Sequence, residues 1–487
     1  MVRDPGREVT GASNPEKTRP ADHDATGPAD QDVTDPANPQ QTHAPNHDTT
    51  GPADQDVTGP IDPEETGGAR RAGTGGPEVE AAGRQSRLGA GRIRQAVAWL
   101  REPLPAPPEV LRRGPLRDGA FPSKLRSTRL TSQLGVALGV AFAVCFVTGL
   151  LSHLIQHPPF WFWWPARPVG LYRFTQGLHV ATGLACVPLL GAKLWSVYPR
   201  LFSWPPARDP AAALERLSIA ALVSAALFQL VSGILNVARW YAPMPFFFTT
   251  AHYWVAWLAI GGLLTHVGVQ LPIIREALGR PVEDGLQLSR RGLLGAVGAA
   301  VGVLTVATIG QTVAPLSPVS LLAPRRPTTG PQRLPVNKTA LRAGVRDAAL
   351  NPAYRLLLVG PTGQLALSTA ALAALPQHTV VLPISCVEGW SSTGTWSGVR
   401  LRDLAALVGA DPDKAQAVVE SLEAGGRYRT SAVATPHLRD PRTLIALRLH
   451  GEPLAIDHGY PARLIAPNRP GVLQTKWVGR ITVSGKK

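Results

Sequence analysis

The sequence predicts a multidomain chain of three unlike parts: a disordered N-terminus, an all-α bundle of transmembrane helices, and an α+β domain at the C-terminus. Three observations support this division. The first 90 or so residues are polar, the middle of the chain holds five long apolar runs, and the last 155 or so residues alternate short strand-like and helix-like runs. At 487 residues, the chain is long enough for several domains.

Residues 1–90 are predicted to be disordered. They consist mainly of Pro, Gly, Asp, Thr and Gln, and such a segment cannot bury enough apolar surface to offset the entropy of ordering. Residues 1–66 carry fourteen acidic against four basic side chains. The nine residues 26–34 recur identically at 50–58, which is a low-complexity duplication rather than a folded repeat. Residues 91–130 are predicted to be a basic juxtamembrane segment.

Five apolar runs follow, and each is near or above the length of about 20 residues that crosses a bilayer core. They lie at 134–154, 174–198, 214–238, 248–271 and 292–314. The first four predict a four-helix transmembrane domain over 131–275. The fifth predicts a separate anchor helix within 286–315.

Positive charge and aromatic residues lie at opposite ends of these runs. Arginines crowd the segment before the first run, the second-to-third connection and the fourth-to-fifth connection, whereas the other connections carry aromatic clusters such as 160–164 and 246–248. Because cytoplasmic loops are enriched in Arg and Lys, the N-terminus is predicted to be cytoplasmic and the C-terminal domain extracytoplasmic. The bases follow this membrane pattern and form no patch interleaved with aromatics, so nucleic acid is not an expected partner.

The fifth run begins with Ser289, Arg290 and Arg291, followed by Gly292 and a Leu-Leu pair. This start resembles a twin-arginine export signal placed inside the chain. Two ordinary cytoplasmic arginines before a membrane helix are the alternative. A twin-arginine signal would carry the C-terminal domain outward already folded around a cofactor.

Cys386 is the one cysteine outside the apolar runs; Cys145 and Cys186 lie inside them and are interpreted as small packing residues. The three cysteines give no disulfide framework and no Cys-x-x-Cys metal motif. Cys386 stands between a strand-like run and a Gly- and Ser-rich stretch, ending near residue 398, that is predicted to be a polar loop. It is a candidate nucleophile or soft-metal ligand, and a small buried packing residue is the alternative.

Short β-branched or alternating runs in residues 330–487 predict strands, and two other runs predict helices. The predicted strands are 355–359, 379–384, 444–449, 463–466 and 477–483, and the predicted helices are 368–374 and 401–408.

Two blocks of this region resemble one known family. The first runs from Pro383 to Trp390 and continues at Trp396-Ser397-Gly398; the second runs from His458 to Pro467 and continues at Lys476-Trp477-Val478. Their order and spacing resemble the molybdopterin-binding domain of the sulfite-oxidase superfamily, in particular the bacterial periplasmic methionine sulfoxide reductase branch. The resemblance covers the last third of the chain.

The resemblance implies a role for each matching residue. Cys386 would supply the thiolate ligand of molybdenum, because an oxo-molybdenum centre of this type takes one soft protein ligand. His458 stands where the methionine sulfoxide reductase branch has Asn. The remaining implied cofactor contacts, which would include Arg and Lys for the pterin phosphate, are Asn337, Arg463, Gln474, Thr475 and Lys476.

Two membrane histidines, His179 and His252, fall at a similar depth on different helices, which suits a b-type haem held by two imidazoles. His266 lies on the same helix face as His252 and about 21 Å deeper. A helix with this spacing resembles the cytochrome b subunits of formate-dehydrogenase type, which bind two haems. Since the first helix has no deep histidine, one haem is expected, with His266 the candidate ligand of a second. Histidines bonded only to carbonyls are the alternative.

These observations predict a membrane-anchored molybdenum oxidoreductase with an extracytoplasmic site. It would transfer an oxygen atom and two electrons with a small S- or N-oxide substrate and exchange electrons through the haem with quinone or another electron-transfer protein. Sulfite is less favoured, because no Arg lies within ten residues of Cys386. The alternatives are a cofactor-free, membrane-tethered binding or assembly module and a transporter that moves protons on its histidines.

Overall fold

The computed structural model describes residues 106, 108–113, 117, 120, 123, 125–201, 210–279 and 287–485. The disordered segment expected at 1–90 lies outside these residues, as does much of the basic segment at 91–130. Within the latter, a short helix α2 (Glu109–Arg113) carries an ion pair between Arg113 and Glu109, 3.3 Å apart.

Each of the five predicted apolar runs forms one long helix. These are α3 (Thr128–Gln156), α4 (Leu171–Leu201), α5 (Pro210–Ala238), α6 (Phe248–Gly279) and α7 (Gln287–Ile309). All five are long and apolar enough to cross a membrane. Only 6% to 33% of the most apolar window of each helix is buried within the protein, so most of this apolar surface is left uncovered by the protein itself.

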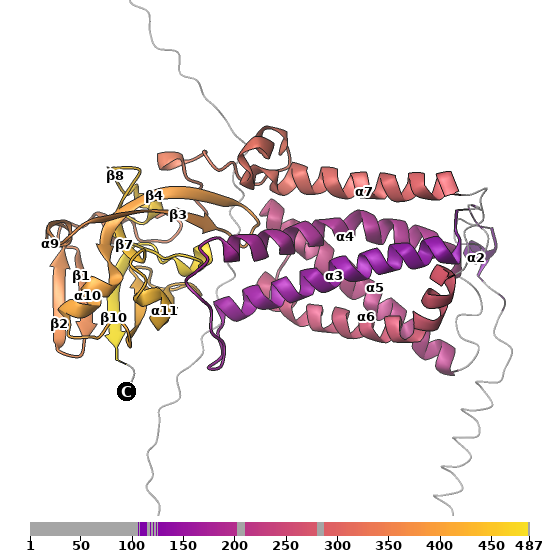
Figure 1. Cartoon of the computed structure of the whole chain (residues 1–487), viewed down its shortest axis with the longest axis horizontal. Helices are drawn as coiled ribbons and strands as arrows, with labels where there is room; N and C mark the ends of the chain where they lie inside the picture. Colours follow the sequence, from indigo (N-terminus) through magenta and orange to yellow (C-terminus); the bar gives the residue numbers. More distant parts are fainter. Residues whose placement is uncertain are drawn as a thin grey trace, which may run out of the picture. The chain divides into compact units, whose positions relative to one another are not determined.

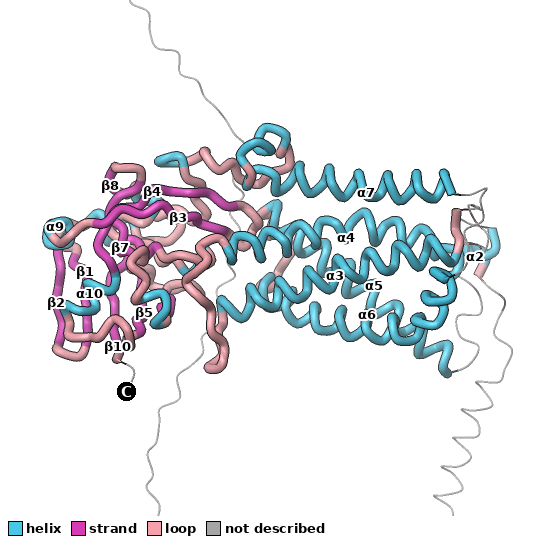
Figure 2. Tube along the Cα trace, in the orientation of Figure 1, coloured by secondary structure: helices cyan, strands magenta, loops and turns pink. Residues whose placement is uncertain are grey.

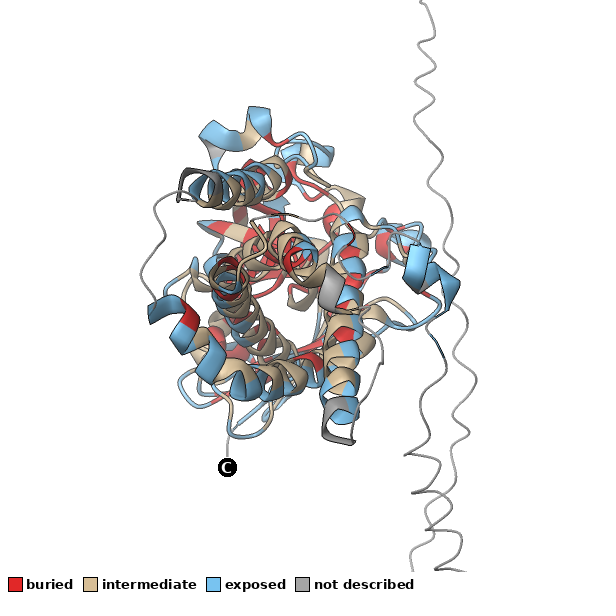
Figure 3. Ribbon diagram, turned by 90° about the vertical axis from the view of Figure 1, so that its right-hand side faces the viewer, coloured by how far each residue is buried: buried red, intermediate tan, exposed pale blue. Residues whose placement is uncertain are grey.

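Helices α3 to α6 form the bundle. Helix α3 packs against α4 and α6, and α5 packs against α6 and α4 (Figure 1). At one crossing, a Cβ added at Gly262 of α6 would lie 3.3 Å from the Leu222 side chain of α5, so a small residue permits this approach. Helix α7 packs on the outside of α4, as the predicted anchor helix would. Exposed residues line the outward faces of the helices (Figure 3).

The C-terminal domain contains two five-stranded sheets (Figure 2). The first has the order β2-β1-β10-β5-β6, in which only the β1–β10 pair is parallel. Its strands are β1 (Arg355–Gly360), β2 (Gly363–Ser368), β5 (Gln416–Ser421), β6 (Thr430–Val433) and β10 (Val478–Ser484).

The second sheet has the order β3-β4-β7-β8, with β9 also paired to β7, and is antiparallel throughout. Its strands are β3 (His378–Ser385), β4 (Ser391–Arg400), β7 (Leu444–Leu449), β8 (Glu452–Pro453) and β9 (Arg463–Ile465). The short helices of this domain are α8 (Arg346–Leu350), α9 (Thr369–Ala374), α10 (Leu401–Leu407) and α11 (Thr435–Leu438).

All five predicted strands and both predicted helices of the domain are confirmed. The polar loop predicted after Cys386 is wrong from Ser391 onward, because that stretch is the central strand β4. Its small residues allow close packing: a Cβ at Gly398 would lie 2.1 Å from the Ile445 carbonyl oxygen, and one at Gly394 would lie 2.8 Å from the Trp396 ring. Here glycine marks a crowded strand rather than a loop.

Candidate functional site

Cys386 begins the tight turn that joins β3 to β4. Its N–H donates to the Trp390 carbonyl at 2.9 Å, and the N–H of Gly389, with φ of 92°, donates to the Cys386 carbonyl at 3.1 Å. The side chain is only 2% exposed, and the Nδ2 of Asn337 lies 2.9 Å from its sulfur. Burial, followed by the nearby Glu388 carboxylate, raises the pKa of the Cys386 thiol. Loss of the proton therefore requires a cation such as a metal ion.

Three of the implied cofactor residues, His458, Arg463 and Lys476, lie at Gly459, whose left-handed backbone brings two cations together. A Cβ at Gly459 would lie 3.1 Å from Lys476 Cβ and 3.2 Å from Arg463 Cβ. Arg463 Nη1 donates to the His458 carbonyl at 3.1 Å. Lys476 Nζ donates at 2.8 Å to the carbonyl of Lys338, the residue after Asn337. The fold thus joins the second sequence block to Asn337.

Several of these residues carry buried polar atoms without a hydrogen-bond partner. They are Asn337 Oδ1, His458 Nδ1, Arg463 Nε and Gln474 Oε1. Arg463 is 4% exposed, and burial lowers its pKa to about 9. Within the described part of the chain, no carboxylate pairs with it. Buried polar groups are normally paired and buried charges compensated, so these residues fit an anionic, polar cofactor.

The protonation of His458 follows from its neighbours. Its Nε2 lies 2.7 Å from the Pro331 carbonyl oxygen, which can only accept, so Nε2 carries the proton and Nδ1 is an acceptor. Burial, then the Arg463 guanidinium, lowers the His458 pKa to about 4. His458 is therefore neutral at physiological pH and offers a bound molecule an acceptor rather than a cation.

Gln474 and Thr475 lead to further buried groups that the sequence did not single out. Thr475 Oγ1 lies 2.7 Å from Ser431 Oγ, and Gln474 Nε2 donates to the Arg469 carbonyl at 3.1 Å. Arg469 is 6% exposed and its Nε has no partner; His437, 4% exposed, has an unpartnered Nε2. Arg469 lies between the two parts of the second sequence block, and this position could have identified it as a candidate cofactor contact.

Two arginines that are distant from Cys386 in sequence lie near it in the folded protein. Arg325, far from Cys386 in the chain, interacts electrostatically with its sulfur. Arg239, at the end of α5, lies with Nε 3.7 Å from the carboxylate of Glu388, two residues after the cysteine. Folding therefore places positive charge beside the cysteine turn, although no arginine is near it in sequence.

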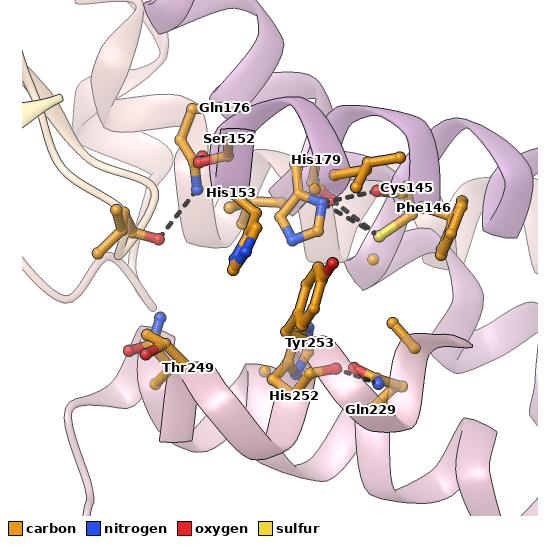
Figure 4. A pocket seen from close by; sticks show the side chains of 18 of the residues that line it. Cys145, Phe146, Ser152, His153, Gln176, His179, Gln229, Thr249, His252 and Tyr253 are labelled. Atoms are coloured by element: carbon orange, nitrogen blue, oxygen red, sulfur yellow. Dashed lines mark hydrogen bonds between the residues drawn. The ribbon is translucent and has the colours of Figure 1, made fainter. Parts of the chain in front are cut away.

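The bundle contains a cavity of about 200 Å³ between α3, α4, α5 and α6 (Figure 4). His179 and His252 face each other across it, with ring centres 6.4 Å apart and ring planes at 79°. His153 lines the same cavity and stacks on Tyr253 at 3.8 Å. The predicted equal depth of His179 and His252 thus corresponds to a direct juxtaposition.

Both facing rings are anchored through Nδ1. For His179, Nδ1 lies 2.8 Å from the Cys145 carbonyl oxygen, so it must donate. For His252, Nδ1 lies 3.1 Å from Ser232 Oγ, whose own proton is used on the Phe228 carbonyl at 2.6 Å. In the neutral imidazole, Nε2 of each ring is therefore unprotonated, and a hydrogen bond at the other ring nitrogen is typical of a metal-binding histidine. Bonding to a carbonyl, the alternative interpretation, accounts for only one nitrogen of His179.

Two glycines leave space for the imidazole rings of His179 and His252, because they have no side chain at the point of contact. A Cβ at Gly149 of α3 would lie 2.7 Å from His179 Cε1, and one at Gly233 of α5 would lie 3.8 Å from His252 Cε1. His266 does not line this cavity; on α6 it interacts electrostatically with Lys193 and Glu215. Within the described residues, no second histidine accompanies it.

The cysteine turn rests on the bundle beside this cavity. Val387, the residue after Cys386, lines the cavity, and its carbonyl accepts a hydrogen bond from Gln176 Nε2 at 3.0 Å. A Cβ at Gly389 would lie 3.1 Å from Val180, the neighbour of His179. The three residues after the cysteine, including Glu388 with Arg239, thus all contact the helical part.

Comparison with known proteins finds a family match and several relatives. Residues 345–487 match the family described as the oxidoreductase molybdopterin binding domain. Mitochondrial sulfite oxidase of Rattus norvegicus is 32% identical over 161 residues, covering 28% of this chain and 30% of that protein. A candidate protein-methionine-sulfoxide reductase subunit, YedZ1, of Azospira oryzae is 35% identical over 113 residues, covering 23% of this chain and 42% of that protein.

Among solved structures, the sulfane dehydrogenase SoxCD of Paracoccus pantotrophus is 23% identical, with 28% of this chain and 39% of that chain covered and a TM-score of 0.25. The chain spans only about 30% of the length of the sulfite oxidases it matches. Residues 345–487 thus match the oxidoreductase molybdopterin binding domain, and part of the chain is similar to sulfite oxidases.

Proposed function

We propose that this chain is a membrane-anchored, molybdopterin-dependent oxidoreductase that exchanges electrons through a b-type haem held between His179 and His252. One observation carries the proposal: Val387, next to Cys386, lines the same cavity as the two histidines. The candidate molybdenum ligand and the candidate haem ligands thus border one region of protein. A cofactor-free module would have no use for this adjacency.

The C-terminal domain would hold the molybdenum cofactor. Cys386 supplies a soft ligand, and Asn337 Nδ2 donates toward its sulfur at 2.9 Å, which stabilises a thiolate. Arg463, which lies 5.4 Å over the Trp396 ring, and Lys476 hold the anionic end, while Gln474, Thr475 and neutral His458 offer polar contacts. When bound, this cofactor supplies two-electron oxygen-atom transfer.

The bundle would hold the haem. His179 and His252 would hold the haem iron through their Nε2 atoms, because Nδ1 of each ring is engaged in a hydrogen bond. The two ring centres lie 6.4 Å apart. When bound, a haem supplies one-electron transfer. One haem is proposed, because His266 has no accompanying histidine among the described residues.

The proposed substrate is a small S- or N-oxide. The positive charge of Arg325 and Arg239 beside the cysteine turn also suits an anionic substrate, so charge does not restrict the class to neutral oxides. We further propose a cytoplasmic N-terminus, an extracytoplasmic molybdopterin domain exported with the help of Arg290 and Arg291, and quinone or an electron-transfer protein as the redox partner.

Molybdenum and haem stoichiometry, measured on one preparation of the full chain, tests the proposal. We expect near-equimolar molybdenum and haem, and a reduced-minus-oxidised haem spectrum that His179→Ala and His252→Ala each abolish. His266→Ala is the matched control and should keep the spectrum. Molybdenum below about a tenth of an equivalent after cofactor-competent expression would overturn the enzyme assignment. Molybdenum without haem would overturn only the electron route.

A further inference from the structure

The histidine cavity changes in polarity along its length. Toward the C-terminal domain its wall carries five polar residues, Ser152, Gln156, His157, Gln176 and Thr249, beside the apolar Val387 and Phe248. Farther along the helices its wall is apolar, with Phe142, Phe146, Leu184, Leu230 and Trp257. No lysine, arginine, aspartate or glutamate is among the residues that line it. A ligand that fills this cavity therefore has one apolar end and one polar end.

Two residues of the C-terminal domain reach the polar end. Arg427 and Tyr428 lie in the turn between β5 and β6. The Arg427 guanidinium is 4.3 Å over the Phe247 ring, and its Nη1 donates to Thr250 Oγ1 at 3.3 Å. Tyr428 Oη donates at 3.3 Å to Oε1 of Gln156, a cavity residue. The molybdopterin domain thus places a permanent cation at the rim of a cavity that has none of its own.

The positive charge at this rim belongs to the exposed side chain of Arg427. Arg427 interacts electrostatically with His153 and His157, which both line the cavity and lie 4.9 Å from each other. Within the part of the chain that the structure describes, no carboxylate pairs with Arg427. A neutral imidazole carries one N–H donor, so the guanidinium and both rings can donate to an anion placed among them.

We propose that Arg427, with His153 and His157, binds the carboxylates of a haem in this cavity, so that the anionic edge of the haem faces the molybdopterin domain. The inference rests on the proposed function, because it requires a haem between His179 and His252. A haem has an apolar ring and two carboxylates on one edge, which matches the polarity of the cavity. Guanidinium–carboxylate contacts are among the strong charge-assisted hydrogen bonds.

A neutral quinol head group is the other molecule that a polar rim could take. It would use Gln156, Gln176 or His153 as hydrogen-bond partners but would gain little from a permanent cation. The unpaired charge of Arg427 therefore favours a carboxylate, and the experiment below separates the two.

The test uses the full-length, cofactor-loaded protein and compares Arg427→Ala and Arg427→Lys with Arg448→Ala, a matched control that removes an exposed cation on β7. Oxidised haem carries one more positive charge than reduced haem, so loss of the nearby cation should lower the haem midpoint potential. Haem transfer to apomyoglobin should be about tenfold faster in Arg427→Ala. The lysine variant should fall between, and the control should match the wild type.

Equal potentials and transfer rates in Arg427→Ala and Arg448→Ala would overturn the inference, as would an unchanged haem accompanied by a raised KM for quinol. Absence of haem from the wild-type protein would remove the proposed electron route itself. The two failures are distinguishable, since only the second is visible before any substitution is made.

Discussion

The surroundings of Cys386 and the histidine cavity of the bundle differ in packing and in charge. Around Cys386, the protein is closed and carries buried cations and polar atoms that lack partners, such as Arg463 Nε and His458 Nδ1. In the bundle, the protein leaves a cavity of about 200 Å³ whose wall is uncharged. The first arrangement selects by charge and hydrogen bonding, and the second selects by shape and two imidazole nitrogens.

This difference has an energetic consequence. A buried, unpaired cation destabilises a fold by several kcal/mol, so we expect an anionic cofactor to stabilise the C-terminal domain. A cavity with an uncharged wall costs less. Substitutions at the first site should therefore act by removing a ligand or a hydrogen bond. Substitutions at the second site should act by changing the space around the histidine rings.

The largest effect is expected for Cys386→Ala. Loss of the only implied protein ligand to molybdenum should lower turnover by at least about a thousandfold while the domain remains folded, because a small buried side chain is replaced by a smaller one. Turnover and circular dichroism of the full chain measure both quantities. Val483→Ala on β10 is the control, since it also shortens a buried side chain of the same domain but lies in a core cluster that does not include Cys386. Retention of more than about a tenth of the activity would contradict the assigned role.

The histidine cavity should bind less haem when a side chain is added to its wall. Gly149→Ala would place a Cβ 2.7 Å from His179 Cε1, so the ring must move away from its Cys145 hydrogen bond. We expect the haem content of the purified protein to fall at least about threefold, since overpacking of this kind costs roughly 1–3 kcal/mol. Gly139→Ala on the same helix is the control, because no atom lies within 4 Å of its added Cβ. Equal haem content in both variants would show that ring position does not limit binding.

Sequence predicted those features that short stretches determine. The five apolar helices and the blocks around Cys386 and Arg463 are local patterns. Strand β4 was missed because its identity depends on distant neighbours: Gly398 is small so that β7 can approach, and no local pattern shows this. Arg325 and Arg469 were missed for the same reason, since their surroundings arise only when separate segments meet.

The histidines show an intermediate case. The depths of His179 and His252 followed from helix lengths, and the structure places the rings together. Which nitrogen is engaged could not be predicted, because it depends on the Cys145 carbonyl and the Ser232 hydroxyl on neighbouring helices. Likewise, only folding shows that Val387 lines the cavity of the bundle.

A smaller effect is expected where the two sites meet. Arg239→Ala removes the cation 3.7 Å from Glu388 while leaving the proposed ligands in place. Both cofactors should remain at wild-type levels, but substrate-driven oxidation of reduced haem should slow by about two- to tenfold, because the cysteine turn is held less firmly. Stopped-flow haem absorbance measures the rate. Arg167→Ala, which removes the 3.0 Å pair with Asp440 away from the cysteine turn, is the control and should keep the wild-type rate.

The smallest expected effect is on the stability of the C-terminal domain at mildly acid pH. Burial, then Arg469, lowers the pKa of His437 to about 3 from its usual 6.5. Below pH 6.5, His437 is therefore protonated in the unfolded chain but not in the folded domain. The free energy of unfolding decreases as the pH falls toward 3. His437→Gln should reduce this loss, measured by hydrogen exchange of the sheet amides in the full chain between pH 7 and 5, whereas His450→Gln at an exposed position should not. A phosphate or other anion near Arg469 would raise the His437 pKa, so a steeper pH dependence in cofactor-free protein would place this cluster within reach of the cofactor.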